Sequence, residues 1–96
     1  MDPLTDNELK NKLSSLNGWE PEGDKIKRNF EFDDFKTALS FIVRVGFDAE
    51  EQGHHPELFN VYNSVSISLS THDAGGKVTE KDINLAKAID AIYKTF

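Results

Sequence analysis

The most regular pattern in the chain is SVSISLST, residues 64–71, in which polar and apolar side chains alternate. Alternation with a period of two is typical of a strand that buries one face and exposes the other. Residues 25–32 alternate in the same way, except that Arg28 falls among the apolar positions. Shorter strand patterns begin at Trp19 and at Phe59, each next to turn residues. The sequence therefore predicts four short strands.

Three helical patterns flank and separate these strands. The first starts at a capping box, Thr5 with Glu8, and the third starts at a second box, Thr79 with Asp82. The middle pattern covers residues 34–52. The resulting order, α-β-β-α-β-β-α with short connections, predicts an α+β fold in which three helices pack on one face of a four-stranded antiparallel sheet.

The middle helix carries more apolar residues than contact with one sheet face requires. Its predicted stripe consists of Phe35, Ala38, Leu39, Ile42, Val45 and Ala49, widened by Phe41, Val43 and Phe47. The helix is either fully buried within this chain or packed also against another subunit. A chain of 96 residues buries only roughly 60–65% of the surface of its unfolded form. Because that core is thin, we favour contact with another subunit.

Composition narrows the class of protein. The length predicts one domain, residues 1–96. The net charge of −6 disfavours direct binding of nucleic acid or anionic lipid. The absence of cysteine excludes disulfides and thiolate chemistry. The polar, acidic N-terminus does not resemble a signal peptide, and no apolar run approaches the roughly 20 residues of a membrane span. We therefore expect a cytoplasmic protein, with a nuclear location also open.

All three histidines fall in loops beside the ends of predicted elements: His54, His55 and His72. If the middle helix extends far enough, Glu50 faces His54 and Glu51 faces His55. Asp73 follows His72, whose side chain points to the serine face if the strand continues that far. Histidine exchanges protons near neutral pH, so the three side chains are candidates for acid–base catalysis.

Other interpretations of these residues stay open. The histidines can be ordinary surface side chains, or they can bind a metal together with Glu50 or Asp73. Adjacent side chains rarely converge on one ion, and no H-E-x-x-H or H-x-H spacing occurs, so we expect no metal. A serine hydrolase is disfavoured by the lack of a G-x-S-x-G motif. Trp19, Phe59 and Tyr62 either pack in the core or offer a wall for a planar heterocycle.

The run EEQGHHPE, residues 50–57, resembles the signature of the pterin-4a-carbinolamine dehydratases. The similarity continues through FNVYN at residues 59–63, LSTH at residues 69–72 and KDINLA at residues 81–86. It covers essentially the whole chain, since the Leu-Thr and Gly-Trp pairs near the N-terminus also match.

The resemblance implies a hydro-lyase that converts 4a-hydroxytetrahydrobiopterin to quinonoid dihydrobiopterin and water in tetrahydrobiopterin recycling. Because the carbinolamine is labile, no metal or organic cofactor is expected. The matching positions imply an active site of His54, His55 and His72, supported by Glu50 and Asp82. We predict that His54 and His72 transfer protons and that His55 orients the pterin. Asp73 is a further expected supporting residue, and Ser70 and Thr71 are expected to contact the substrate.

The sequence departs from the family pattern at Leu58, where members often carry Trp. The change is either a tolerated apolar swap or a wider pocket mouth with altered pterin affinity. The family also implies a homodimer or homotetramer, and some members act as dimerisation cofactors of a homeodomain transcription factor. A protein-interaction module acting as a transcriptional coactivator is therefore a second hypothesis, and a generic ligand-binding domain is a third. The intact histidines favour the enzyme.

Overall fold

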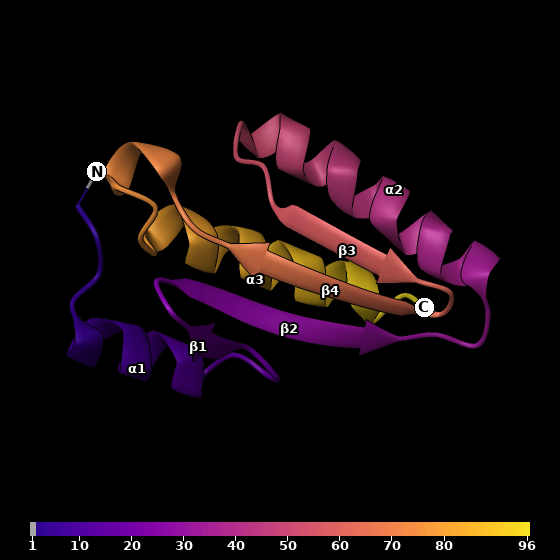
Figure 1. The fold of residues 1–96 in the computed structure, drawn as a ribbon, viewed down its shortest axis with the longest axis horizontal. Helices are drawn as coiled ribbons and strands as arrows, with labels where there is room; N and C mark the ends of the chain where they lie inside the picture. The colour runs from indigo at the N-terminus through magenta and orange to yellow at the C-terminus, as the bar shows by residue number, and fades with distance from the viewer. Residues whose placement is uncertain (1) are drawn as a thin grey trace.

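A computed structural model describes residues 2–96, so Met1 of the acidic N-terminal segment lies outside the described residues. The elements are α1 (Asp6–Ser14), β1 (Glu20–Glu22), β2 (Lys25–Glu31), α2 (Phe35–Gln52), β3 (Glu57–Val61), β4 (Ser64–Leu69), a 3-10 turn η1 (His72–Ala74) and α3 (Glu80–Tyr93). Figure 1 shows α3 behind the sheet, α2 along β3, and α1 next to β1. The predicted α+β class and the order α-β-β-α-β-β-α are confirmed.

The four strands form one antiparallel sheet in the order β1-β2-β4-β3. The register places Ile26 opposite Leu69 and Phe30 opposite Val65, so the apolar positions of β2 and β4 share the buried face. The strand predicted to continue to Thr71 ends at Leu69, and η1 begins at His72. The condition on which His72 was expected to point to the serine face, a strand that continues to it, is therefore not met.

Helix α2 supplies the centre of the core through Ala38, Phe41, Val45 and Ala49. The buried stripe is rotated from the predicted one, because Phe41 belongs to it whereas Phe35 and Leu39 do not. A separate line of apolar side chains remains 45–75% exposed: Phe35, Leu39, Val43 and Phe47. These residues are spaced by four and so lie along one side of the helix. The prediction that α2 carries more apolar residues than contact with one sheet face requires is confirmed, and the interpretation that this chain buries all of them is wrong.

The two helix ends nearest the histidines are set by specific caps. Gly53 adopts the left-handed conformation that ends α2, with φ 65°, and turns the chain into the His54–His55 loop. Thr79 and Asp82 form the predicted capping box that starts α3. Both predicted capping boxes are present, since Thr5 and Glu8 form the other. Among residues 2–96, no helix is both long enough and apolar enough to cross a bilayer.

Candidate active site

All three histidines line one cavity of about 220 Å³. Its walls come from the end of α2, from the segment after β4 and from the first turn of α3: Gly53, His54, His55, Ser70, Thr71, His72, Asp73 and Lys81. Residues from positions 53 to 81 are thus brought together at one end of the sheet. The structure thus places His54, His55 and His72 around one cavity, as the sequence predicted.

His54 is held by a buried carboxylate. Its Nε2 lies 2.5 Å from Oδ1 of Asp82, a residue with no exposed surface. The other carboxylate oxygen of Asp82 accepts hydrogen bonds from the Thr71 hydroxyl at 2.8 Å and from the Thr79 backbone N–H at 2.9 Å. Three donors around one carboxylate compensate for its burial, and hydrogen bonds to a charged acceptor are the strong ones. Asp82 therefore fixes the orientation of the His54 ring.

The second ring nitrogen of His54 faces the cavity. Within residues 2–96, no buried side-chain nitrogen or oxygen lacks a hydrogen-bond partner. His54 Nδ1 has no such partner, so solvent in the cavity reaches this atom. In a neutral imidazole one nitrogen donates and the other accepts. With Nε2–H donated to the Asp82 carboxylate, Nδ1 is the nitrogen that can accept a proton from a bound molecule.

His55 has a different environment from His54. Its Nε2 lies 2.7 Å from Glu50 Oε1, and both side chains are mostly exposed. The predicted pairs, Glu50 with His54 and Glu51 with His55, were wrong. The left-handed Gly53 ends the helix before the spacing of four applies, so Glu50 reaches His55 and His54 turns to Asp82 instead.

His72 begins η1 directly after Thr71 and lies on the cavity rim with Asp73 and Ser70. Within residues 2–96 its ring takes part in no hydrogen bond or ion pair, so both nitrogens remain available to a ligand. Lys81 adds a positive charge to the same rim. Sequence reasoning missed Lys81, although its place in the first turn after the Thr79 cap would have put it near the histidines.

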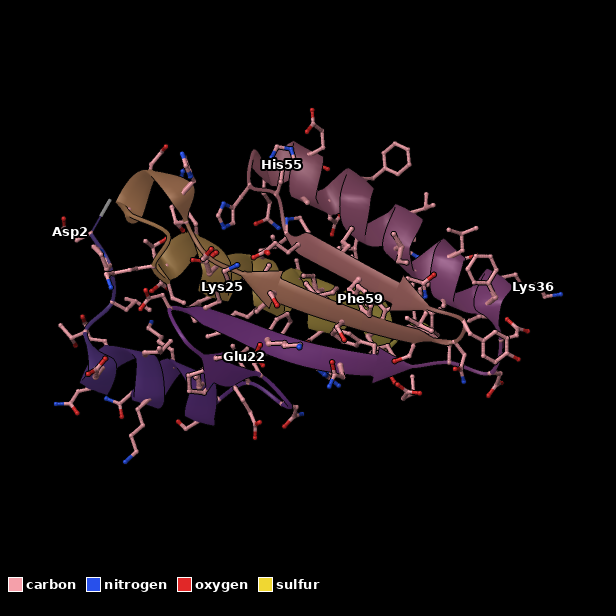
Figure 2. All side chains as sticks on the ribbon, in the orientation of Figure 1. Asp2, Glu22, Lys25, Lys36, His55 and Phe59 are labelled. Carbon is pink, nitrogen blue, oxygen red and sulfur yellow. The ribbon has the colours of Figure 1, made fainter. Side chains whose placement is uncertain are left out.

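The predicted aromatic wall is not built at this cavity by the described chain. Trp19 is 3% exposed, donates its indole N–H to Asp90 at 2.8 Å and packs edge-on against Phe30, so the core interpretation holds for it. Phe59, Tyr62 and Leu58 are exposed and do not line the cavity. Figure 2 shows Phe59 over the middle of the sheet, away from His55 at the end of α2.

Metal binding was the alternative role of the histidines. Within residues 2–96, no group of three or more histidine, cysteine, aspartate or glutamate side chains is arranged to hold an ion. His54 and His55 are directed to separate carboxylates, as adjacent side chains commonly diverge. The cavity thus combines three histidines with the contact of His54 and the buried Asp82.

A family model described as pterin 4 alpha carbinolamine dehydratase matches residues 2–92. This chain belongs to that family. A relative from Opitutus terrae with the provisional name pterin-4-alpha-carbinolamine dehydratase is 46% identical over 89 residues, covering 93% of this chain and 92% of the relative. A Burkholderia pseudomallei relative with the same provisional name is 50% identical over 93 residues, covering 95% and 91%.

Two solved structures share this fold. The crystal structure of a transcriptional coactivator/pterin dehydratase from Brucella melitensis superimposes with a TM-score of 0.91 at 40% identity, covering 96% of this chain and 99% of that one. A pterin dehydratase-like protein identified as a RuBisCO assembly factor in the alpha-carboxysome has a TM-score of 0.69 at 21% identity, covering 80% and 90%. The second likeness shows the fold alone.

Proposed function

We propose that residues 1–96 form one catalytic domain that dehydrates 4a-hydroxytetrahydrobiopterin to quinonoid dihydrobiopterin and water. The observation that carries the proposal is the single cavity lined by His54, His55 and His72, with His54 backed by Asp82. Membership of the pterin-4a-carbinolamine dehydratase family supports the choice of substrate. The reaction belongs to tetrahydrobiopterin recycling.

The dehydration needs two proton transfers. The C4a–O bond breaks as the hydroxyl takes a proton and leaves as water, and N5 gives up its proton to a base. His54 Nδ1 suits the base, because the imidazolium that forms keeps its Nε2–H on the Asp82 carboxylate. His72 suits the acid, because its ring has no competing partner within residues 2–96. Each transfer by a positioned group contributes roughly 10²–10⁴-fold.

The remaining residues of the cavity have supporting roles in the proposal. His55, held by Glu50, orients the pterin, and Ser70 and Asp73 contact it at the rim. Thr71 acts mainly through Asp82, to which its hydroxyl is bonded. Leu58, Phe59 and Tyr62 stay candidates for substrate contacts, whereas the burial of Trp19 takes it out of the proposed site. The chemistry needs no metal or organic cofactor, since the carbinolamine is already labile.

The proposal includes a homodimer or homotetramer. The exposed line of Phe35, Leu39, Val43 and Phe47 on α2 supports it, because side chains of this size at 45–75% exposure are stabilised when a second apolar surface covers them. The acidic net charge of −6 fits a cytoplasmic or nuclear protein that does not bind nucleic acid directly.

The deciding experiment follows the dehydration of 4a-hydroxytetrahydrobiopterin by ultraviolet absorbance. Wild type is measured beside His54→Ala and His72→Ala, with His55→Ala as the comparison for an orienting role. We expect acceleration above the spontaneous rate that is lost in the first two variants and reduced less in the third. Equal small losses in all three would contradict the division of roles. No wild-type acceleration would reject the enzyme, and pterin binding without turnover would favour a ligand-binding domain.

A second function is a protein-interaction module that acts as a dimerisation cofactor and transcriptional coactivator. The exposed apolar line on α2 favours it, and so does the likeness to the Brucella protein, which is described as both coactivator and pterin dehydratase. A pull-down with a homeodomain transcription factor tests it. Retained capture by His54→Ala would separate this function from catalysis.

A further inference from the structure

A second hollow, of about 360 Å³, lies between the end of α1, β2 and the second half of α3. Three cations line it: Arg28 from β2, and Lys87 and Lys94 from α3 and its end. Within residues 2–96 its one acidic side chain is Asp90, which leaves a charge balance of +2. This balance stands out in a chain whose net charge is −6. We call this hollow the Arg28 pocket.

One side of α3 supplies a wall of the Arg28 pocket. Lys87, Asp90, Ala91 and Lys94 are spaced by three and four, so they lie on the same side of the helix. Within residues 2–96, the ammonium groups of Lys87 and Lys94 form no ion pair or hydrogen bond, unlike four other lysines of the chain. Two unpaired cations along one pocket attract an anion placed between them.

Arg28 is held in place but keeps unused hydrogen-bond donors. Its side chain is 17% exposed, and Nη1 donates to Asp90 Oδ1 at 2.7 Å. The guanidinium also lies over the rings of Phe30 and Tyr93. Nε and Nη2 have no acceptor within residues 2–96, and no unpartnered side-chain nitrogen there is buried, so solvent reaches both atoms. A guanidinium already held in place loses little freedom when it binds an anion.

Arg28 borders three hollows, and within residues 2–96 the Arg28 pocket is the one with an excess of positive charge. Each of the other two combines two basic with two acidic residues: Arg28 and Lys94 with Glu31 and Asp33, and Lys27 and Arg28 with Glu20 and Glu22. The charges of those linings cancel. An anion that uses the free donors of Arg28 is therefore best placed in the Arg28 pocket.

The charge balance favours a phosphate monoester over a single carboxylate. A phosphate monoester carries about −1.5 to −2 charges at neutral pH, which matches the balance of +2. Arginine binds phosphate oxygens through parallel N–H groups, and lysine binds them as a point charge. The volume of the pocket falls within the range of small-molecule sites, about 300–1,000 Å³. Leu16 and the ring of Tyr93 offer apolar surface to the rest of such a molecule.

We propose that the Arg28 pocket binds a small molecule with a phosphate monoester group, which Arg28, Lys87 and Lys94 hold. The pocket shares no lining residue with the histidine cavity. The proposal therefore does not depend on the proposed dehydration, and its test needs no pterin.

Trp19 supplies the readout of the test. Its indole N–H donates to Asp90 Oδ1, the oxygen that also accepts from Arg28. It is the one tryptophan of the chain, so ¹⁵N-labelled protein gives a single indole signal in the NMR spectrum. An anion that binds Arg28 changes its hydrogen bond with Asp90 and thereby shifts this signal. Inorganic phosphate is the probe, and sodium chloride at equal ionic strength is the control for general screening of charge.

We expect a shift of the Trp19 signal that saturates with phosphate and is not reproduced by chloride. Lys87→Gln combined with Lys94→Gln should weaken phosphate binding by roughly tenfold or more, because two charge-assisted contacts are lost. Both lysines are exposed, so the fold is expected to tolerate the changes. Lys10→Gln combined with Lys36→Gln is the matched control, since these exposed lysines lie outside the pocket. This control should change binding by less than about twofold.

Three results would overturn the proposal: a phosphate shift that does not saturate, one that chloride reproduces, or equal phosphate binding by the two double variants. Succinate tests the chemistry of the ligand, because it offers carboxylates instead of phosphate oxygens. Weaker binding of succinate than of phosphate would support a phosphate ligand. Binding of succinate as tight as that of phosphate, or tighter, would overturn that assignment.

Discussion

Helix α3 carries two carboxylates eight residues apart that have opposite kinds of partner. Asp82 is fully buried and bonds His54, a side chain that can release its proton. Asp90 is mostly buried and accepts from the indole of Trp19 at 2.8 Å and from Arg28 at 2.7 Å. Arginine stays charged at any working pH. The two carboxylates thus have different partners, an imidazole at one end of the helix and a guanidinium with an indole at the other.

The contact with Asp90 also explains why Arg28, a charged residue, lies on the apolar face of β2. The Arg28 guanidinium lies 4.6 Å from the ring centre of Phe30 and 5.1 Å from that of Tyr93, a favourable cation–π arrangement. Its charge is matched by Asp90 rather than by solvent. Arg28 therefore fits the apolar face because its long side chain packs against rings while its charge is paired.

The largest difference between the two ends should appear in catalysis. We expect Asp82→Asn to lower kcat for pterin dehydration by roughly 10²–10⁴-fold, because the amide forces the wrong tautomer of His54. Asp90→Asn keeps an acceptor for both of its donors and lies outside the cavity, so its kcat should match wild type. Absorbance kinetics on both variants measure this. Similar losses in the two would show that the carboxylates do not differ in role.

The role of Asp90 should appear in stability. Asp90→Ala leaves the charge of Arg28 and the indole N–H of Trp19 without their acceptor. Removing one partner of a buried pair costs about 3–5 kcal/mol, and the slight exposure of this pair puts the expected loss near the lower end, about 3 kcal/mol. Urea unfolding at a fixed protein concentration gives the value. A loss within that of an ordinary surface substitution would contradict a structural role for Asp90.

A smaller contrast lies within the cavity, between the two adjacent histidines. The ion pair of His55 with Glu50 is mostly exposed, and such pairs are worth only about 0–1 kcal/mol. Glu50→Gln should therefore change kcat/KM by less than about fivefold. Glu51→Gln, which alters a neighbouring exposed carboxylate without a link to His55, is the matched control. A loss as large as that of Asp82→Asn would mean that Glu50 has a direct part in catalysis.

Much of the fold could be predicted because its signals are local. The alternation in β4, the capping boxes at Thr5 and Thr79 and the excess apolar surface of α2 all depend on residues close in sequence. The errors have one cause each. The 3-10 turn at His72 ended the strand early, and the left-handed Gly53 redirected Glu50. Local sequence patterns do not specify the direction that the chain takes after a turn.

The sequence could predict that the three histidines lie together, but it could not predict which carboxylate each of them contacts. His54 and Asp82 are 28 residues apart, and their contact depends on how α3 packs beneath the end of α2. The capping role of Asp82 was evident from its spacing to Thr79, yet one oxygen of the same carboxylate serves the cap and the other serves His54. The capping motif fully explains Asp82 in the sequence, so nothing there indicates that the same carboxylate also contacts His54.

The caps at the other helix starts, Thr5 and Asp34, have no such second side-chain partner within residues 2–96, and the Asp34 cap allows the smallest prediction. Hydrogen bonding from Thr37, by its side chain and its backbone N–H, lowers the pKa of Asp34 from its ordinary value of 3.8. A lowered pKa in the folded state means that Asp34 adds stability above the unfolded value and loses it as the pH falls through the folded value. Asp34→Asn keeps an acceptor at the cap but does not titrate.

Between about pH 5 and pH 3, wild type should therefore lose more stability than Asp34→Asn, by a margin smaller than any effect above. Urea unfolding at the two pH values measures the margin. Glu20→Gln is the control, because Glu20 is exposed and makes no hydrogen bond or ion pair through its side chain within residues 2–96. An Asp34→Asn curve parallel to wild type would show that the cap stabilises α2 through geometry alone. A steeper loss in wild type and Glu20→Gln than in Asp34→Asn would show that the charge of Asp34 stabilises the start of α2.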